Sequence, residues 1–226
     1  MQESPEFLAR QRAGTLSAQP LRTTLAHHRP GIARSFAISA LGSITYYVGI
    51  TYVPTFLSTT GSLSEGTALI FSTAAALVVI LITPVVGALS DRFGRRPVLI
   101  ALCVFSMVLP ATMFTVMAGG SLPHALAAVI VLAAVAGGVS AVGAVATAEQ
   151  FPVEARLSGL ALGATVATAI FGGLTPYLAQ VGIEGTGSAM MPGIMIAVVA
   201  LCVLPVFARL PETAPPRASS EAKRGD

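Results

Sequence analysis

The chain has 226 residues and a net charge of +3, and 54% of its residues are hydrophobic while only 10% are charged. Soluble domains carry roughly 25% charged residues, so this composition indicates a protein whose solvent is largely the lipid bilayer. The basic residues form no continuous patch with aromatic side chains between them, which excludes a nucleic-acid-binding surface. The two cysteines lie inside separate apolar runs, which favours core packing over a disulfide framework.

Residues 1–33 are polar and lack the apolar core of a signal peptide, so we expect a cytoplasmic linker segment there. A membrane-spanning helix needs about 20 apolar residues. Residues 34–210 contain six uncharged runs of about this length and are predicted to form a six-helix transmembrane domain. The runs are Ser35–Ser58, Gly66–Ser90, Pro97–Ala118, Pro123–Ala148, Leu157–Gln180 and Ala189–Ala208. Residues 211–226, rich in proline and charge, are predicted to be a disordered cytoplasmic tail.

The basic residues predict the orientation of the spans. If successive connections alternate between the two sides, all 13 basic residues fall on the side that also holds both termini. The opposite side then carries only Glu65 and Glu184 as charged residues. Because cytoplasmic loops are enriched in Lys and Arg, this split predicts a multi-pass protein of the cell's inner membrane with both termini in the cytoplasm.

Two sequence fragments recur about half a membrane domain apart. Thr83-Pro84 near the end of the second span matches Thr175-Pro176 near the end of the fifth. Val108-Leu109-Pro110 in the third span matches Val203-Leu204-Pro205 in the sixth. This spacing suits a 3+3 inverted repeat of three-helix units, although chance recurrence of proline is an open alternative.

The first span is unusually polar for a membrane helix. It contains Tyr46, Tyr47 and Thr51 together with further hydroxyl-bearing residues. A hydroxyl facing lipid is costly unless it is hydrogen-bonded, so these three are predicted to line a solute cavity. Tyrosine rings can also surround a quaternary ammonium group through cation–π contacts. The alternative to a cavity is that these tyrosines belong to an ordinary aromatic belt at the membrane surface.

The loop after the second span concentrates four charges in six residues. It runs from Gly87 to Pro97 with the sequence GALSDRFGRRP, and its functional candidates are Gly87, Asp91, Arg92, Gly94, Arg95 and Arg96. We expect Gly87 to allow close helix approach and Gly94 to support a tight turn. The arginines are predicted to pair with Glu149 at the end of the fourth span. Asp91 is predicted to meet the start of the fifth span near Arg156.

Such a network of charges suits a cytoplasmic gate that stabilises one of two conformations. The alternative is a cluster that only sets the orientation of the spans in the membrane.

The Gly87–Arg96 loop resembles the signature loop of the major facilitator superfamily, with a match at every defined position. Three further segments resemble its metabolite:proton symporter branch, which includes proline/betaine, citrate, 2-oxoglutarate and shikimate permeases. They are Thr45–Tyr47 taken together with Thr51–Leu57, then Ala148–Arg156, and Phe171–Pro176. The tyrosine-rich first span is most similar to the proline/betaine type, and Leu210–Thr213 resembles the end of the last helix of related porters.

The resemblance implies an all-α membrane protein that forms half of a twelve-helix fold, with the six spans in the place of helices 7 to 12. It also implies a secondary transporter that carries a small metabolite, such as proline, betaine or an organic acid, together with a proton. No metal or other cofactor is expected. The partners implied are the lipid bilayer and either a missing N-terminal six-helix half or a second copy. In this arrangement the first, second, fourth and fifth spans leave one concave face open, and the third and sixth face lipid.

The middle of every predicted span lacks Asp, Glu, Lys, Arg and His, so the proton-coupling group is expected in the missing half. The alternative function is a non-transporting membrane partner or remnant derived from a transporter. An enzyme is disfavoured because the spans hold no catalytic motif, and a channel because no filter motif is present.

Overall fold

The computed structural model describes residues 20–213, which are almost entirely helical. A short helix, α2 (Pro20–His27), precedes the spans. The first span consists of α3 (Arg29–Tyr46), the π-helical segment η1 (Tyr47–Thr51) and α4 (Val53–Thr59). Then follow α5 (Glu65–Phe93), α6 (Arg95–Gly119) and α7 (Leu122–Ala148). The fifth span is divided into α8 (Val153–Leu160), η2 (Ala161–Thr165), α9 (Val166–Thr168), η3 (Ala169–Gly173) and α10 (Thr175–Thr186), and α11 (Met191–Ala208) is the sixth.

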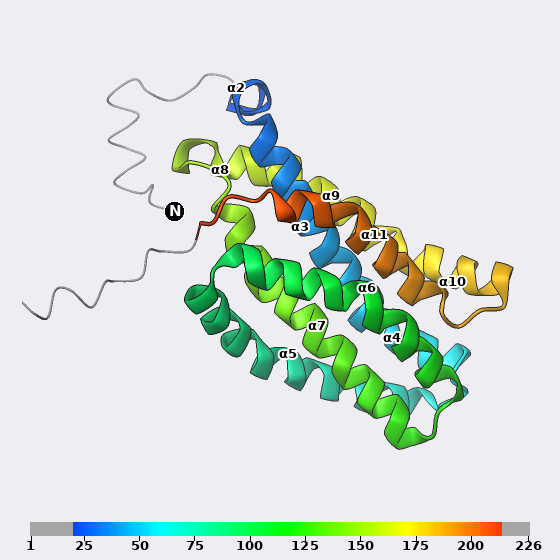
Figure 1. Ribbon diagram of the computed structural model, residues 1–226. Helices are drawn as coiled ribbons and strands as arrows, with labels where there is room; N and C mark the ends of the chain where they lie inside the picture. Colours follow the sequence, from blue (N-terminus) through cyan, green and yellow to red (C-terminus); the bar gives the residue numbers. More distant parts are fainter. Residues whose placement is uncertain (1–19, 214–226) are drawn as a thin grey trace, which may run out of the picture.

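Five of these units are long and apolar enough to cross a membrane, and the bent pair of α3–η1 and α4 makes a sixth. The prediction of six spans is therefore confirmed within residues 20–213. Their ends at the charged side are close in space. Figure 1 shows α2, the α5–α6 turn, the α7–α8 turn and the end of α11 gathered at its left and upper left. We call this the arginine end of the bundle, because Arg34, Arg92, Arg95, Arg156 and Arg209 lie there.

The first span differs from the straight helix that we expected over Ser35–Ser58. It bends by 40° between η1 and α4, with Tyr52 at the break. Thr45 donates its hydroxyl to the carbonyl of Leu41 at 2.7 Å, a side-chain bond that is associated with bent helices. Pro54, in the first turn of α4, has no backbone N–H to continue the helical ladder. By contrast, the prolines inside α5, α6 and α11 interrupt none of those helices.

Helix α7 lies at the centre of the bundle and packs against α3, α5 and α6 (Figure 1). Its glycines allow this close packing. A Cβ at Gly137 would come within 2.7 Å of Ile82 on α5, and one at Gly138 within 2.9 Å of Leu102 on α6. The absence of side chains at these two positions therefore allows α7 to pack closely against α5 and α6.

Helix α6 packs mainly against α11, and both still present apolar side chains outward, among them Phe105 and Leu201. Helix α5 carries the longest exposed apolar row of the described chain. Its members are Leu69, Ile70, Leu77, Ile80, Leu81, Val85, Leu89 and Phe93. The outward face of α5 is thus available to lipid or to another polypeptide.

The domain boundaries need two corrections. Residues 20–33 are not only a linker, because they form α2 and the beginning of α3, whose first residue is Arg29. The predicted disordered tail begins too early, because Glu212 and Thr213 form hydrogen bonds with α6 and α7. Residues 1–19 and 214–226, including the rest of that tail, lie outside the described residues.

Replacement of Gly193 by alanine is expected to loosen the contact between α6 and α11. A Cβ at Gly193 would collide with backbone atoms of Pro110 and Ala111, which have no rotamer that relieves the clash. Overpacking of this kind costs about 2 kcal/mol, measurable by unfolding in mixed micelles with increasing SDS. Gly66→Ala is the matched control, since its Cβ would meet no atom within 4 Å. Equal stability of the two variants would contradict this packing.

Candidate functional site

A single residue connects α5 to α6 at the arginine end. Gly94 ends one helix and begins the next, with φ 104° and ψ 154°. Only glycine adopts this region of backbone conformation without strain. A Cβ on Gly94 would also lie 2.5 Å from the Glu212 carboxylate. The expectation of a tight turn at Gly94 is therefore confirmed, and the absence of a side chain there admits a residue from the far end of the sequence.

The carboxylate of Glu212 caps helix α6. The backbone N–H of Arg95 donates to Oε1 at 2.7 Å, and that of Arg96 donates to Oε2 at 3.1 Å. These amides belong to the first turn of α6, where no intrahelical acceptor exists and the helix dipole favours a negative charge. The next residue, Thr213, donates its hydroxyl to Glu149 at the end of α7 at 2.5 Å. The segment after α11 thus joins α6 to α7.

The side chain of Arg95 is the buried centre of this region. It is only 7% exposed, and its guanidinium donates to Ser90 Oγ at 2.9 Å and to Asp91 Oδ1 at 2.5 Å. Its second terminal nitrogen lies 3.5 Å from Glu149 Oε1. The predicted pairing of a loop arginine with Glu149 is therefore present. We call the group the Arg95 network, comprising Ser90, Asp91, Arg95, Glu149, Glu212 and Thr213.

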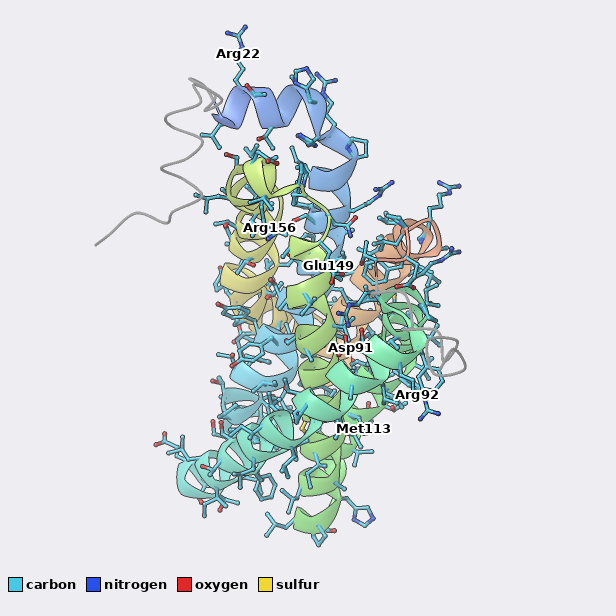
Figure 2. The ribbon with its side chains drawn as sticks, turned by 90° about the vertical axis from the view of Figure 1, so that its left-hand side faces the viewer. Arg22, Asp91, Arg92, Met113, Glu149 and Arg156 are labelled. Atoms are coloured by element: carbon cyan, nitrogen blue, oxygen red, sulfur yellow. The ribbon has the colours of Figure 1, made fainter. Side chains whose placement is uncertain are left out.

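Asp91 and Arg156 do not meet as expected. Asp91 pairs with Arg95, one helical turn away, and Figure 2 shows Arg156 on α8 well apart from Asp91. The expected contact between Asp91 and the start of the fifth span is therefore wrong. Gly87 also differs from expectation, because a Cβ there would meet nothing within 4 Å, so close helix approach does not explain this glycine.

The two remaining arginines of the loop are exposed. Arg92 lies 5.5 Å from the centre of the Phe93 ring and points away from the network (Figure 2). Arg96 contributes its backbone amide to the Glu212 cap, while its side chain is exposed. Arg95 is the loop arginine whose guanidinium contacts Ser90, Asp91 and Glu149.

A hollow of about 460 Å³ opens between α3, α7 and the fifth span. Tyr46 and Tyr47 both line it, as predicted for a solute cavity, and the ring of Tyr47 packs over Gly172. Thr51 does not line it, because this residue lies exposed in η1. The other hydroxyl-bearing lining residues are Ser39, Ser43, Ser140, Thr147 and Thr168. None of the residues that line the hollow is charged.

Several of these residues were not among the predicted site residues. Ser140 and Thr147 lie on α7, and Thr168 lies in the fifth span. Glu212 and Thr213 fall within the predicted disordered tail. The Leu210–Thr213 resemblance was the one available signal that this segment has a structural role.

At the far end of the bundle, polar contacts link the first and fifth spans. Tyr52 is 3% exposed at the bend of the first span and donates its hydroxyl to Gln180 Oε1 on α10 at 2.6 Å. Gln180 in turn donates to Glu184 at 2.9 Å. Tyr52 is therefore a structural contact outside the hollow, in contrast to Tyr46 and Tyr47.

Comparison with known proteins agrees with this geometry. The citrate-proton symporter of Klebsiella pneumoniae is 33% identical over 90% of this chain and 46% of its own length. The proline/betaine transporter of Salmonella typhimurium is 32% identical over 76% of this chain and 34% of its own length. The alpha-ketoglutarate permease of Escherichia coli is 31% identical over 62% of this chain and 33% of its own length.

The chain thus spans about a third to a half of the length of these relatives. The family model of the Major Facilitator Superfamily matches residues 16–225, a range that includes all six spans and the Arg95 network. The chain is a multi-pass membrane protein that belongs to the Major Facilitator Superfamily.

Proposed function

We propose that this chain is the C-terminal half of a secondary transporter that carries a small metabolite together with a proton. The observation that supports this most directly is the uncharged, hydroxyl-lined hollow bordered by Tyr46 and Tyr47. Its volume of about 460 Å³ is within the range of small-molecule sites. The named solutes of the relatives, citrate, proline and betaine, are of a size that such a hollow can hold in part.

In this proposal the protein lies in the inner membrane with the arginine end, and hence both termini, in the cytoplasm. The described arginines are all at that end, as the bias of cytoplasmic loops requires. The Arg95 network then acts as a cytoplasmic gate element. Its ion pairs link α5, α6 and α7, and the hydrogen bond from Thr213 to Glu149 adds the segment after α11; these contacts stabilise one conformation and must be rearranged in the other.

The proposed partner is an N-terminal six-helix half, with a second copy of this chain as the competing possibility. Helix α5 exposes an apolar row from Leu69 to Phe93 that a partner can cover. Proton coupling needs a titratable group in the solute path, and the residues lining the hollow include no carboxylate or histidine. We therefore assign the proton site to the partner.

The proposal is tested by uptake into cells that lack the corresponding permeases. The chain is expressed alone, or together with the N-terminal half of the Klebsiella citrate-proton symporter or of the Salmonella proline/betaine transporter. We expect uptake of labelled citrate or proline by the pairs, abolished by a protonophore, and none by the chain alone. Either N-terminal half expressed alone is the control. Membrane-inserted pairs that carry neither solute above that control would overturn the proposal.

A further inference from the structure

The hydroxyl groups around the hollow differ in their bonding from those elsewhere in the spans. Outside the hollow, hydroxyls commonly donate to a backbone carbonyl one turn earlier on the same helix. Examples are Thr45, Thr73, Thr83, Ser106, Thr115 and Thr175. This local bond satisfies the hydroxyl at little cost in an apolar environment.

Around the hollow, no such local bond occurs within the described part of the chain. Ser39, Ser140 and Thr147 line the hollow without a hydrogen bond from their hydroxyls to any described residue. Ser43 and Thr168 bond to each other across two spans, with 2.9 Å between their oxygens. Hydroxyl groups that do not donate to a backbone carbonyl of their own helix are available to hydrogen-bond a bound solute.

The Ser43–Thr168 pair also occupies a distinctive position in the backbone. Ser43 lies on α3 shortly before η1, and Thr168 ends α9, between the two π-helical segments η2 and η3. Such segments frequently mark functional sites, since they widen the helix and release backbone bonds. The pair is thus a polar link between the two interrupted spans, at the wall of the hollow.

We propose that Ser43 and Thr168 form a hydroxyl clip that binds a carboxylate group of the transported solute. When the solute enters, the hydroxyls exchange their mutual bond for two bonds that they donate to the carboxylate oxygens. At 2.9 Å apart, both hydroxyls can reach one carboxylate group. This inference rests on the proposed transport function and assigns one part of the solute to one part of the hollow.

The clip gives solute binding a structural consequence. The Ser43–Thr168 hydrogen bond links α3 to α9. A bound carboxylate replaces that bond and releases the direct link between the two interrupted spans. Binding at the clip therefore shifts the first and fifth spans toward the relative position for which the solute has the higher affinity. The size of the shift depends on the difference between the solute's affinities for the two positions.

The test uses the full chain co-expressed with the N-terminal half of the Salmonella proline/betaine transporter. Uptake of labelled proline is inhibited with glycine betaine or with choline, which share a trimethylammonium group but differ in the carboxylate. We expect Ser43→Ala and Thr168→Val each to weaken inhibition by glycine betaine about tenfold, because each removes a hydrogen bond to a charged group. Inhibition by choline should stay within about twofold, since no lost bond involves it.

Matched controls separate this role from a structural one. Ser106→Ala and Thr83→Val remove the same atoms from hydroxyls that bond locally and lie outside the hollow. Ser43→Thr and Thr168→Ser keep the hydroxyl and should retain inhibition by glycine betaine.

The outcomes distinguish the clip from transport itself. Suppose that the unaltered pair transports proline, and that glycine betaine and choline inhibit uptake by the Ser43→Ala and Thr168→Val variants as strongly as uptake by the unaltered pair. The clip proposal is then wrong and the transport proposal stands. An equal loss for glycine betaine and choline would also overturn the clip, because it would indicate a general distortion. If the unaltered pair carries neither proline nor citrate, both proposals fail together.

Discussion

Replacement of Gly94 by alanine is expected to destabilise the chain by about 3 kcal/mol, since strain in this glycine-only backbone region and loss of a helix cap act together. At φ 104° the new side chain strains the turn, and its Cβ displaces the Glu212 carboxylate from the first amides of α6. The free energy of unfolding in mixed micelles measures the loss. In the transporter pair, the same change should reduce uptake by altering the Arg95 network.

Gly87→Ala is the matched control, since it changes another glycine of the same loop motif. Its Cβ would meet nothing within 4 Å, and the residue is part of helix α5. Alanine is the better helix former, so stability should stay level or rise by up to about 1 kcal/mol. If Gly87→Ala proved as harmful as Gly94→Ala, the motif glycines would share a role that the geometry of Gly94 does not explain.

Replacement of Arg95 by alanine is expected to cost about 2 kcal/mol, because it leaves the buried Ser90 hydroxyl and the partly buried Glu149 carboxylate without the guanidinium. Ser90 is fully buried, and its hydroxyl would lose the hydrogen bond that it accepts from the Arg95 guanidinium. Glu149 is 27% exposed and, among residues 20–213, would keep only its bond from Thr213. Unfolding in mixed micelles measures the stability, and uptake by the transporter pair measures the function.

Arg96→Ala provides the control for Arg95. Its exposed side chain should be dispensable, within about 0.5 kcal/mol, because the Glu212 cap uses only the backbone amide of Arg96. The ion pair itself is tested by charge exchange. Arg95→Glu and Glu149→Arg should each impair uptake, and their combination should recover part of it. Single reversals that leave uptake unchanged would show that the network has no gating role.

The spans and their order were predictable because they depend on local composition. The run from Gly66 to Ser90 lacks charges, and the structure extends it only to Glu65–Phe93 as α5. The interruptions of the first and fifth spans were not predictable in this way. Pro54 was a local signal for the bend of the first span, but the interrupted spans also contact each other, as Tyr47 does with Gly172 and Tyr52 with Gln180. Composition does not encode these contacts between spans.

In the candidate site, too, some contacts were predictable from the sequence and others were not. The pairing of Arg95 with Glu149 followed from the placement of opposite charges on one side of the membrane. The cap by Glu212 did not, because 117 positions separate it from Arg95 and the residues after it are polar and proline-rich. For Asp91, local pairing with Arg95 at i,i+4 outcompeted the more distant partner that we expected.

The last turn of α7 carries Thr147, which lines the hollow, and leads directly into Glu149, which holds Arg95. If this turn couples the hollow to the Arg95 network, each site changes the other by the same coupling free energy, because linkage between two sites is reciprocal. If the proposed solute shifts Thr147, we expect a change in the hydrogen bond between Thr213 and Glu149. Through the neighbouring Glu212, we also expect a change in the protection of the Arg95 and Arg96 amides from hydrogen exchange. Hydrogen exchange at the α5–α6 turn can thus report on occupancy of a hollow that the turn does not line.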